Sequence, residues 1–327
     1  MIVSKLTIGT IHMRFPPGFE RLGLLAWRSA PRAPAGDERS GPRPEWPAGM
    51  NSGGQRRTPT DAPVPLSELR AALAGSGVRN RYQPIVRFAD RLPVGLEVLA
   101  RLEHPTRGLL GPDQFVTQFE DVGLVWDLTQ AVVREAFADW NGDRLDRLGL
   151  TLALNLPLDL LLLPATLGWL DGQRRAAGIE ATRINVELTE SQPVARIDEL
   201  RAAVAGLRGA GYGVAIDDVG PGVRDHRALL DLDFSILKLD KELVRGSREN
   251  PTAQDFLLRA VEAARAARLL VIAEGVEDAE IWDRMQRLGV DEAQGYLIAR
   301  PLEAAAVPAW HRDWCARHRP PSSPATF

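Results

Sequence analysis

Residues 183–190 read Arg183-Ile184-Asn185-Val186-Glu187-Leu188-Thr189-Glu190, a short and largely apolar run with carboxylates at its end. Similar runs recur along the chain, and most are apolar throughout rather than alternating. This is the pattern of strands that are covered on both faces. We expect eight strands, over residues 81–88, 94–102, 150–156, 183–188, 213–217, 235–239, 270–273 and 295–298.

Amphipathic stretches separate these runs and predict helices over residues 121–141, 198–209, 253–267 and 279–288. Eight strands with intervening helices in about 240 residues indicate an α/β fold in which the sheet closes into a (β/α) barrel. A doubly wound open sheet is the alternative. It would need a glycine-rich phosphate loop, and we find none.

The first 65 residues have a different composition. Ten of the 24 prolines precede residue 66, and residues 31–65 are rich in Pro, Gly, Ser, Arg and Ala without a period. Such a segment buries too little apolar surface to fold alone. It is either a disordered extension or, if translation truly starts at Met50, a stretch whose residues before Met50 do not belong to the protein. We expect the barrel over 66–315 and a flexible tail over 316–327. Ser67 is expected to cap a helix that reaches Ala74 and stops at Gly75.

Charge and cysteine content exclude some classes. The chain carries a net charge of −3, although residues 1–62 are basic, so the folded part is acidic. This argues against binding a nucleic-acid polymer. The one cysteine, Cys315, excludes an internal disulfide and a cysteine zinc site. No apolar run reaches the roughly 18 residues of a membrane span. We therefore expect a cytoplasmic protein.

Polar side chains stand at the end of nearly every expected strand, where the mouth of a barrel places them together. Each one alone is more often a helix cap, a turn residue or half of an ion pair. Their joint pattern is better explained by hard divalent cations, Mg²⁺ or Mn²⁺, held by oxygen ligands. The polar residues that make up this pattern are Glu97, Asn155, Glu187, Asp217, Asp218, Lys238, Glu274, Glu277 and Gln294.

Several segments resemble the EAL domain family in order and spacing over roughly residues 66–302. They include Glu97-Val98-Leu99-Ala100-Arg101, Asp217-Asp218-Val219-Gly220, Leu237-Lys238-Leu239-Asp240, Ala273-Glu274-Gly275-Val276-Glu277 and Gln294-Gly295-Tyr296-Leu297. The resemblance implies a modified (β/α) barrel. It also implies hydrolysis of the bacterial second messenger cyclic di-GMP to the linear dinucleotide pGpG, by water activated between two metal ions.

The resemblance also assigns roles by matched position. Metal ligands would be Glu97, Asn155, Glu187, Asp217 and Asp218. Glu274 would be the general base, with Lys238, Glu277 and Gln294 assisting. Contacts to the ligand would come from Gln83, Leu99, Arg101 and Asp240. The family further suggests a homodimer.

One loop departs from the family. Asp218 is followed by Val219-Gly220-Pro221-Gly222-Val223-Arg224-Asp225, which replaces the aromatic and hydroxyl residues usual in active members. Pro221 stiffens this loop. An alternative function follows, namely a weak or inactive receptor that binds cyclic di-GMP and signals through a partner.

Overall fold

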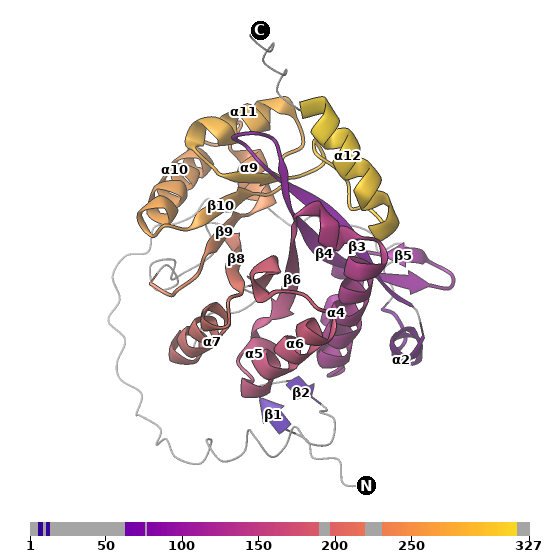
Figure 1. Cartoon of the computed structure of the whole chain (residues 1–327). Coiled ribbons are helices and arrows are strands. Elements are labelled where there is room, and N and C mark those ends of the chain that lie inside the picture. The colour runs from indigo at the N-terminus through magenta and orange to yellow at the C-terminus, as the bar shows by residue number, and fades with distance from the viewer. Residues whose placement is uncertain are drawn as a thin grey trace, which may run out of the picture.

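A closed ring of strands organises the protein (Figure 1). The structure, a computed structural model, describes residues 6–8, 11–13, 63–75, 77–189, 197–219 and 231–318. In its larger sheet the order is β3-β11-β10-β9-β8-β7-β6-β4-β5, and β3 also pairs with β4, so that eight of the nine strands close. The ring strands are β3 (Val78–Arg87), β4 (Pro93–His104), β6 (Thr151–Pro157), β7 (Ile184–Thr189), β8 (Gly213–Val219), β9 (Ile236–Leu239), β10 (Leu270–Ala273) and β11 (Glu292–Gln294).

Strand β3 runs against its neighbours. It is antiparallel to both β4 and β11, whereas the other contacts in the ring are parallel. The first residues of β3 therefore lie at the end of the barrel where the parallel strands finish. Short β5 (Gly108–Leu110) pairs only with β4 among the described strands and extends the sheet outside the ring.

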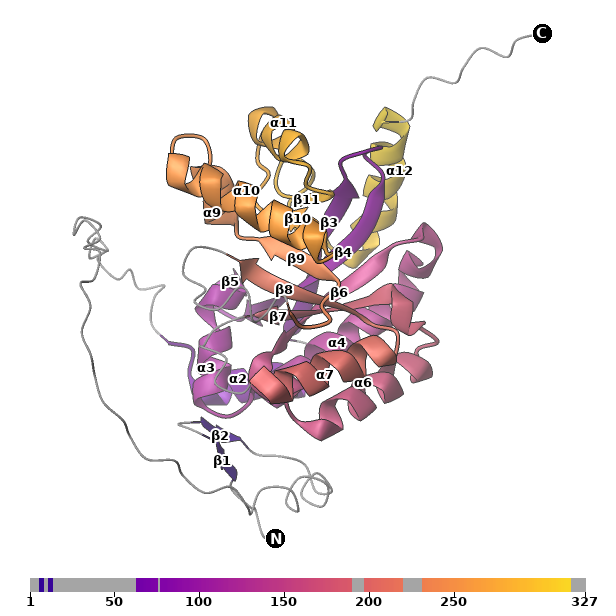
Figure 2. The same cartoon turned by 90° about the vertical axis from the view of Figure 1, so that its left-hand side faces the viewer.

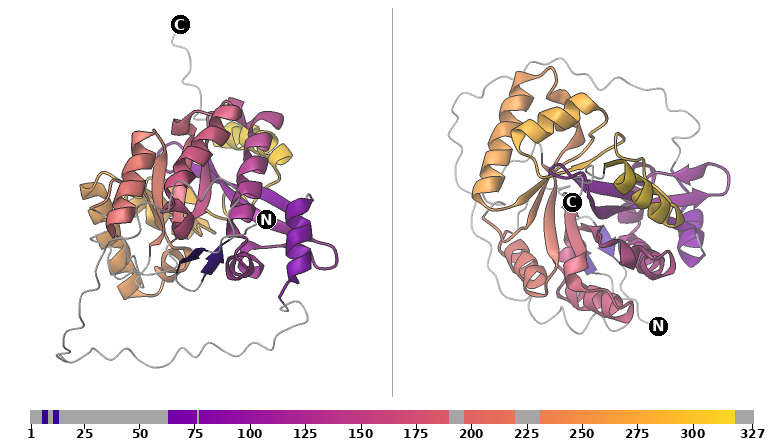
Figure 3. Two further views of the ribbon diagram at one scale, coloured as in Figure 1. Left: turned by 90° about the horizontal axis from the view of Figure 1, so that it is seen from below. Right: turned by 45° about the horizontal axis from the view of Figure 1, so that its top comes forward.

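Helices surround the ring and cover its outer surface (Figures 1 and 3). The strands present fully buried side chains to them, including Leu152, Val186 and Val214. This burial on both faces explains the apolar strands. The helices are α4 (Val125–Gly142), α5 (Leu158–Leu161), α6 (Pro164–Ala176), α7 (Ile197–Gly209), α9 (Lys241–Gly246), α10 (Pro251–Ala266), α11 (Ala279–Leu288) and α12 (Val307–His318).

A smaller core lies beside the barrel. Helices α2 (Leu66–Ala74) and α3 (Val116–Asp121) pack there near β5 (Figure 2). Leu69, Phe119 and Leu110 form this core with Leu102 of β4 and Leu128 of α4. The core therefore joins the first helix to the barrel wall.

The barrel prediction is confirmed, and two local predictions are wrong. The last strand is Glu292–Gln294 rather than 295–298, because the chain turns at Gly295, where an added Cβ would lie 2.1 Å from the Val276 carbonyl oxygen. Ser67 does not cap α2: the N-cap is Pro65, which makes no side-chain capping bond. The predicted end at Ala74 is correct.

The predictions for the two ends of the chain fall mostly outside the described residues. Within 1–65 the structure describes an antiparallel pair, β1 (Leu6–Ile8) with β2 (Ile11–Met13), and residues 63–65. The tail beyond His318 is not described. No helix in the described ranges is both long and apolar enough to cross a membrane.

Candidate active site at the mouth of the barrel

Four carboxylates surround one buried lysine. Lys238, on β9, is 0% exposed, and its Nζ lies 2.6 Å from Glu274 Oε1 and 2.9 Å from Glu187 Oε2. The same nitrogen lies 3.0 Å from Asp217 Oδ1 and 3.7 Å from Glu97 Oε2. These acids come from β7, β8, β4 and the residue after β10. The predicted convergence of the strand ends is therefore present in the structure.

Parallel register brings these side chains to one level. Glu97 pairs with Ala153, two residues before Asn155, and Asn155 pairs with Glu187 on the next strand. Because the side chains of a strand alternate between faces, residues at matched register can share the inner face of a barrel. Short strands that end at this level leave the carboxylates at the mouth.

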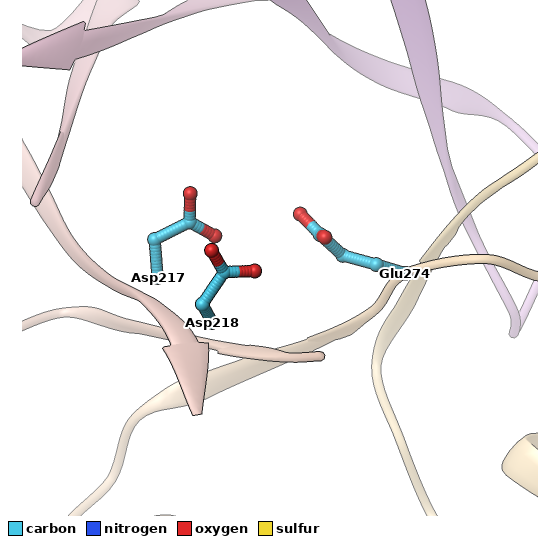
Figure 4. Close-up of side chains that lie close together, drawn as sticks. All are labelled: Asp217, Asp218 and Glu274. Atoms are coloured by element: carbon cyan, nitrogen blue, oxygen red, sulfur yellow. The ribbon is translucent and has the colours of Figure 1, made fainter. Parts of the chain in front are cut away.

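Asp217 and Asp218 reach the same site although they are adjacent. In a regular strand, neighbouring side chains point to opposite faces. The pairing of β8 with β9 is irregular between Ile216 and Val219, and Asp218 has a φ of 55°. This irregularity turns both carboxylates toward Glu274 (Figure 4). Oxygens of all three residues lie within 4.8 Å of one another.

Two amides hold the position of Glu97. Gln294 Nε2 donates to Glu97 Oε2 at 2.6 Å and to Gln83 Oε1 at 3.0 Å. Asn155 Nδ2 donates to Glu97 Oε1 at 3.0 Å. Gln294 Oε1 is buried and has no hydrogen-bond partner among the described residues. The site thus keeps an acceptor available for a ligand.

Burial and mutual repulsion perturb the acids. Burial raises the pKa of Glu187 well above its usual value, and it raises the pKa of Glu274 to about 8, although Lys238 opposes both shifts. Burial and the charge of Asp217 raise the pKa of Asp218. Burial also disfavours ionisation of Glu97, but Lys238 and the two amides outweigh it and lower the pKa of Glu97.

Lys238 responds in the opposite way to burial. Burial alone would lower its pKa, but the surrounding carboxylates, Glu187 and Glu274 foremost, raise it well above the usual value. The lysine therefore stays charged. One ammonium group cannot neutralise four carboxylates. The site therefore favours the binding of protons or metal ions, which would reduce the remaining negative charge.

A cleft of about 960 Å³ opens over this cluster. Its walls include the predicted residues Gln83, Leu99, Arg101 and Glu277. Asp240 is not among the lining residues. Its carboxylate instead caps α9 by accepting hydrogen bonds from the backbone nitrogens of Glu242 and Leu243, both at 3.0 Å.

The sequence analysis missed two basic residues of the cleft lining. Lys241 and Arg245 lie one turn apart on α9 and bring positive charge to the cleft wall. The signal that could have found them is their i, i+4 spacing directly after the Leu237-Lys238-Leu239-Asp240 segment. That spacing places two side chains on one face of a helix.

The donors suit hard divalent cations. Asp217, Asp218 and Glu274 offer clustered carboxylate oxygens, and no sulfur or imidazole ligand belongs to the group. Mg²⁺ and Mn²⁺ prefer such oxygen ligands. The negative excess around Lys238 and the unpaired Gln294 oxygen agree with this chemistry.

Comparisons with known proteins agree with the geometry. The EAL domain model matches residues 66–301, and the chain therefore belongs to the EAL domain family. The chain is 31% identical over 255 residues to "Cyclic di-GMP phosphodiesterase NbdA" of Pseudomonas aeruginosa, covering 78% of this chain and 33% of that protein. It is 29% identical over 251 residues to "Cyclic di-GMP phosphodiesterase PdeR" of Escherichia coli, covering 77% and 38%.

A solved structure is also similar. The structure "PaMucR Phosphodiesterase, c-di-GMP complex" superposes with a TM-score of 0.70 at 28% identity, over 74% of this chain and 98% of that one. The match covers only 33% of NbdA and 38% of PdeR, so this chain spans about a third of the length of these curated relatives. Family and fold are thus shown by both sequence and structure.

Proposed function

We propose that this chain hydrolyses one phosphodiester bond of cyclic di-GMP and releases the linear dinucleotide pGpG. The observation that supports this most strongly is the cluster of Glu97, Glu187, Asp217 and Glu274 around Lys238. Glu97, Asp217 and Glu274 line the cleft, whereas Glu187 and Lys238 are buried and do not. The names of the similar phosphodiesterases support the choice of substrate.

Two divalent cations would be held by Glu97, Asn155, Glu187, Asp217 and Asp218. Such ions, when bound, lower the pKa of water and stabilise charge on the attacking and leaving oxygens. The choice between Mg²⁺ and Mn²⁺ stays a prediction. The protein itself supplies fixed oxygens, since Gln294 and Asn155 already orient both oxygens of Glu97.

Glu274 is suited to accept a proton from water. It is enclosed by the site, its pKa is raised to about 8 mainly by burial, and Lys238 holds one of its oxygens at 2.6 Å. A base works best when its pKa lies near the working pH. The water oxygen bonds to phosphorus as its proton passes to Glu274. The bond from phosphorus to one 3′ oxygen breaks, that oxygen takes up a proton from solvent, and the single linear product carries a 5′ phosphate and a new 3′ hydroxyl.

The remaining roles follow from position. Lys238 would stabilise the attacking water or phosphate, and Glu277 and Gln294 would assist. Gln83, Leu99 and Arg101 would contact the ligand from the cleft wall. Asp240 would act indirectly, by holding the start of α9 in place, because its carboxylate caps this helix and does not line the cleft. A homodimer, a cytoplasmic location and the barrel limits 66–315 also stay predictions.

A turnover assay tests the proposal. Purified protein with cyclic di-GMP and Mg²⁺ or Mn²⁺ should give pGpG, and a chelator should stop the reaction. Glu274→Gln removes the base while keeping its size, so the rate should fall by about 10²–10⁴-fold. Binding of cyclic di-GMP without product at any protein concentration would instead support the receptor alternative. That alternative rests on the loop after Asp218, whose residues 220–230 lie outside the described part of the chain.

A further inference from the structure

Helix α9 and the loop after β10 are joined by an arginine–glutamate pair on the cleft wall. Arg245 of α9 forms an ion pair with Glu277, and its Nη1 lies 3.1 Å from Glu242 Oε1. Arg245 and Glu277 both line the cleft, and their side chains are 37% and 36% exposed. The pair is therefore in a position to meet a ligand.

The backbone of this loop is fixed independently of the pair. The amide of Glu274 donates to the Leu239 carbonyl at 3.2 Å, and that of Val276 donates to the Gln294 carbonyl at 3.0 Å. Gly275 has a φ of +66°, and a Cβ there would lie 2.7 Å from Lys241 Cβ. Glu274 is thus placed by the backbone. The Glu277 side chain, in contrast, is paired with Arg245.

The charge at the cleft floor makes the direction of the Glu277 side chain matter. Four carboxylates already share Lys238, so a released Glu277 would add another anion facing a ligand with two phosphates. Like charges placed close together weaken binding. We propose that Arg245 is a positioning residue that holds Glu277 against α9 and keeps its charge away from the phosphates. This inference rests on the proposed function for the identity of the ligand.

A different role for Arg245 would be direct contact with a phosphate. A double-mutant cycle separates the two roles. The probe is a phosphorothioate analogue of cyclic di-GMP that resists hydrolysis, and its Kd is measured by calorimetry with Mg²⁺ present. The full-length proteins compared are wild type, Arg245→Ala, Glu277→Gln and the double variant. Arg245→Lys and Arg259→Ala serve as matched variants; Arg259 pairs with exposed Asp255 on α10.

Arg245→Ala should weaken binding about five- to tenfold, and adding Glu277→Gln should restore the Kd to within about twofold of wild type. Arg245→Lys should retain most of the affinity, and Arg259→Ala should change nothing. Equal weakening with and without Glu277 would overturn the inference in favour of direct phosphate contact. An unchanged Kd in Arg245→Ala would also overturn it.

Turnover of cyclic di-GMP by the same proteins provides a separate readout. If the cycle gives the expected pattern but wild type forms no pGpG, the hydrolysis proposal fails and the role of Arg245 stands. If wild type turns over and the cycle shows no coupling, the role of Arg245 fails alone. If wild type neither binds the analogue nor forms pGpG, both are overturned.

Discussion

Asp218 shows how one unusual residue completes the site. Its left-handed backbone and the irregular pairing of β8 place it beside Asp217 on the same side of the strand. Aspartate and asparagine adopt this conformation more readily than other non-glycine residues. A charge and a backbone requirement therefore coincide at one position.

Substitutions at Asp218 can separate these two requirements. Asp218→Asn should keep the melting temperature, because asparagine tolerates the backbone, but should weaken Mn²⁺ binding about tenfold or more. Asp218→Val should weaken Mn²⁺ binding and should also lower the free energy of unfolding by about 1–2 kcal/mol. Mn²⁺ titration and thermal unfolding of both variants measure the two effects. Unchanged metal affinity in Asp218→Asn would remove Asp218 from the ligand set.

Lys238 should be needed for folding as well as for activity. It is fully buried, and four carboxylates lie within 3.7 Å of its Nζ. Removing one partner of a buried ion pair leaves uncompensated charge, which costs about 3 kcal/mol or more.

The variant Lys238→Met keeps the length of the side chain and removes its charge. Its free energy of unfolding in urea with a chelator present should fall by that amount. The control Arg259→Ala, on an exposed pair, should change the free energy of unfolding by less than about 1 kcal/mol. A midpoint equal to wild type in Lys238→Met would show that the acids carry protons rather than charge.

Helix ends reveal which elements the sequence specifies well. Glycines in the left-handed conformation follow four of the described α-helices: Gly123 after α3, Gly178 after α6, Gly211 after α7 and Gly289 after α11. Helix α10 instead ends in Arg268, with a φ of 60°, and the amide of Leu269 reaches back to the carbonyl of Ala264 at 2.8 Å. This is the usual geometry of a glycine-terminated helix, occupied by arginine.

Arg268→Gly should therefore stabilise the protein by about 0.5–1 kcal/mol, because glycine adopts this conformation without a steric penalty. The matched change Gly178→Ala, at a φ of +70° with nothing within 4 Å of an added Cβ, should destabilise it by about 1 kcal/mol for the converse reason. Urea unfolding of both variants provides the comparison. A loss of stability in Arg268→Gly would mean that contacts of the arginine side chain outweigh its backbone strain.

The elements also show the limits of prediction from sequence. Apolar runs located seven of the ring strands within a few residues, because burial on both faces leaves a continuous pattern. The eighth was displaced, since Tyr296, Leu297 and Ile298 are as apolar as a strand while Gly295 turns the chain away. The antiparallel direction of β3 could not be predicted, because an apolar run does not indicate the direction of its strand in the sheet.

The site itself was largely predictable, with two exceptions. Acids at strand ends converge because the strands are parallel, so their positions follow from the barrel alone. Asp240 belongs to a segment that matches the family, yet its carboxylate caps α9. Lys241 and Arg245 were missed because they lie on α9, beyond the strand ends, and the pairing of Arg245 with Glu277 joins residues of two different elements.

For the whole molecule, two carboxyl groups outside the site should contribute to the pH dependence of stability: Glu135, and Glu292, whose pKa burial raises to about 7. Burial and the charge of Asp139 raise the pKa of Glu135, on α4, to about 7 from a usual 4.5. A raised pKa means that the folded state binds the proton more tightly than the unfolded chain. The resulting stabilisation is complete below about pH 4.5 and is lost as the pH rises through about 7.

Glu135→Gln should flatten this dependence and raise the free energy of unfolding by about 1 kcal/mol near pH 8, a value discounted because the group is partly exposed. Near pH 5 the change should be small. The control is Glu262→Gln, an exposed residue of α10. Urea unfolding at pH 5 and pH 8 measures the free energy of unfolding of both variants. An equal effect of Glu135→Gln at the two pH values would contradict the raised pKa of Glu135.

The reversed direction of β3 decides at which end of the barrel the chain enters it. Since Val78 pairs with Leu102 near the end of β4, the polypeptide enters beside the cleft rather than at the far end of the barrel. From that entry, β3 leads to Gln83, whose amide is bonded to Gln294. The first strand of the ring thus runs from the mouth of the barrel directly to a group that supports Glu97 through Gln294.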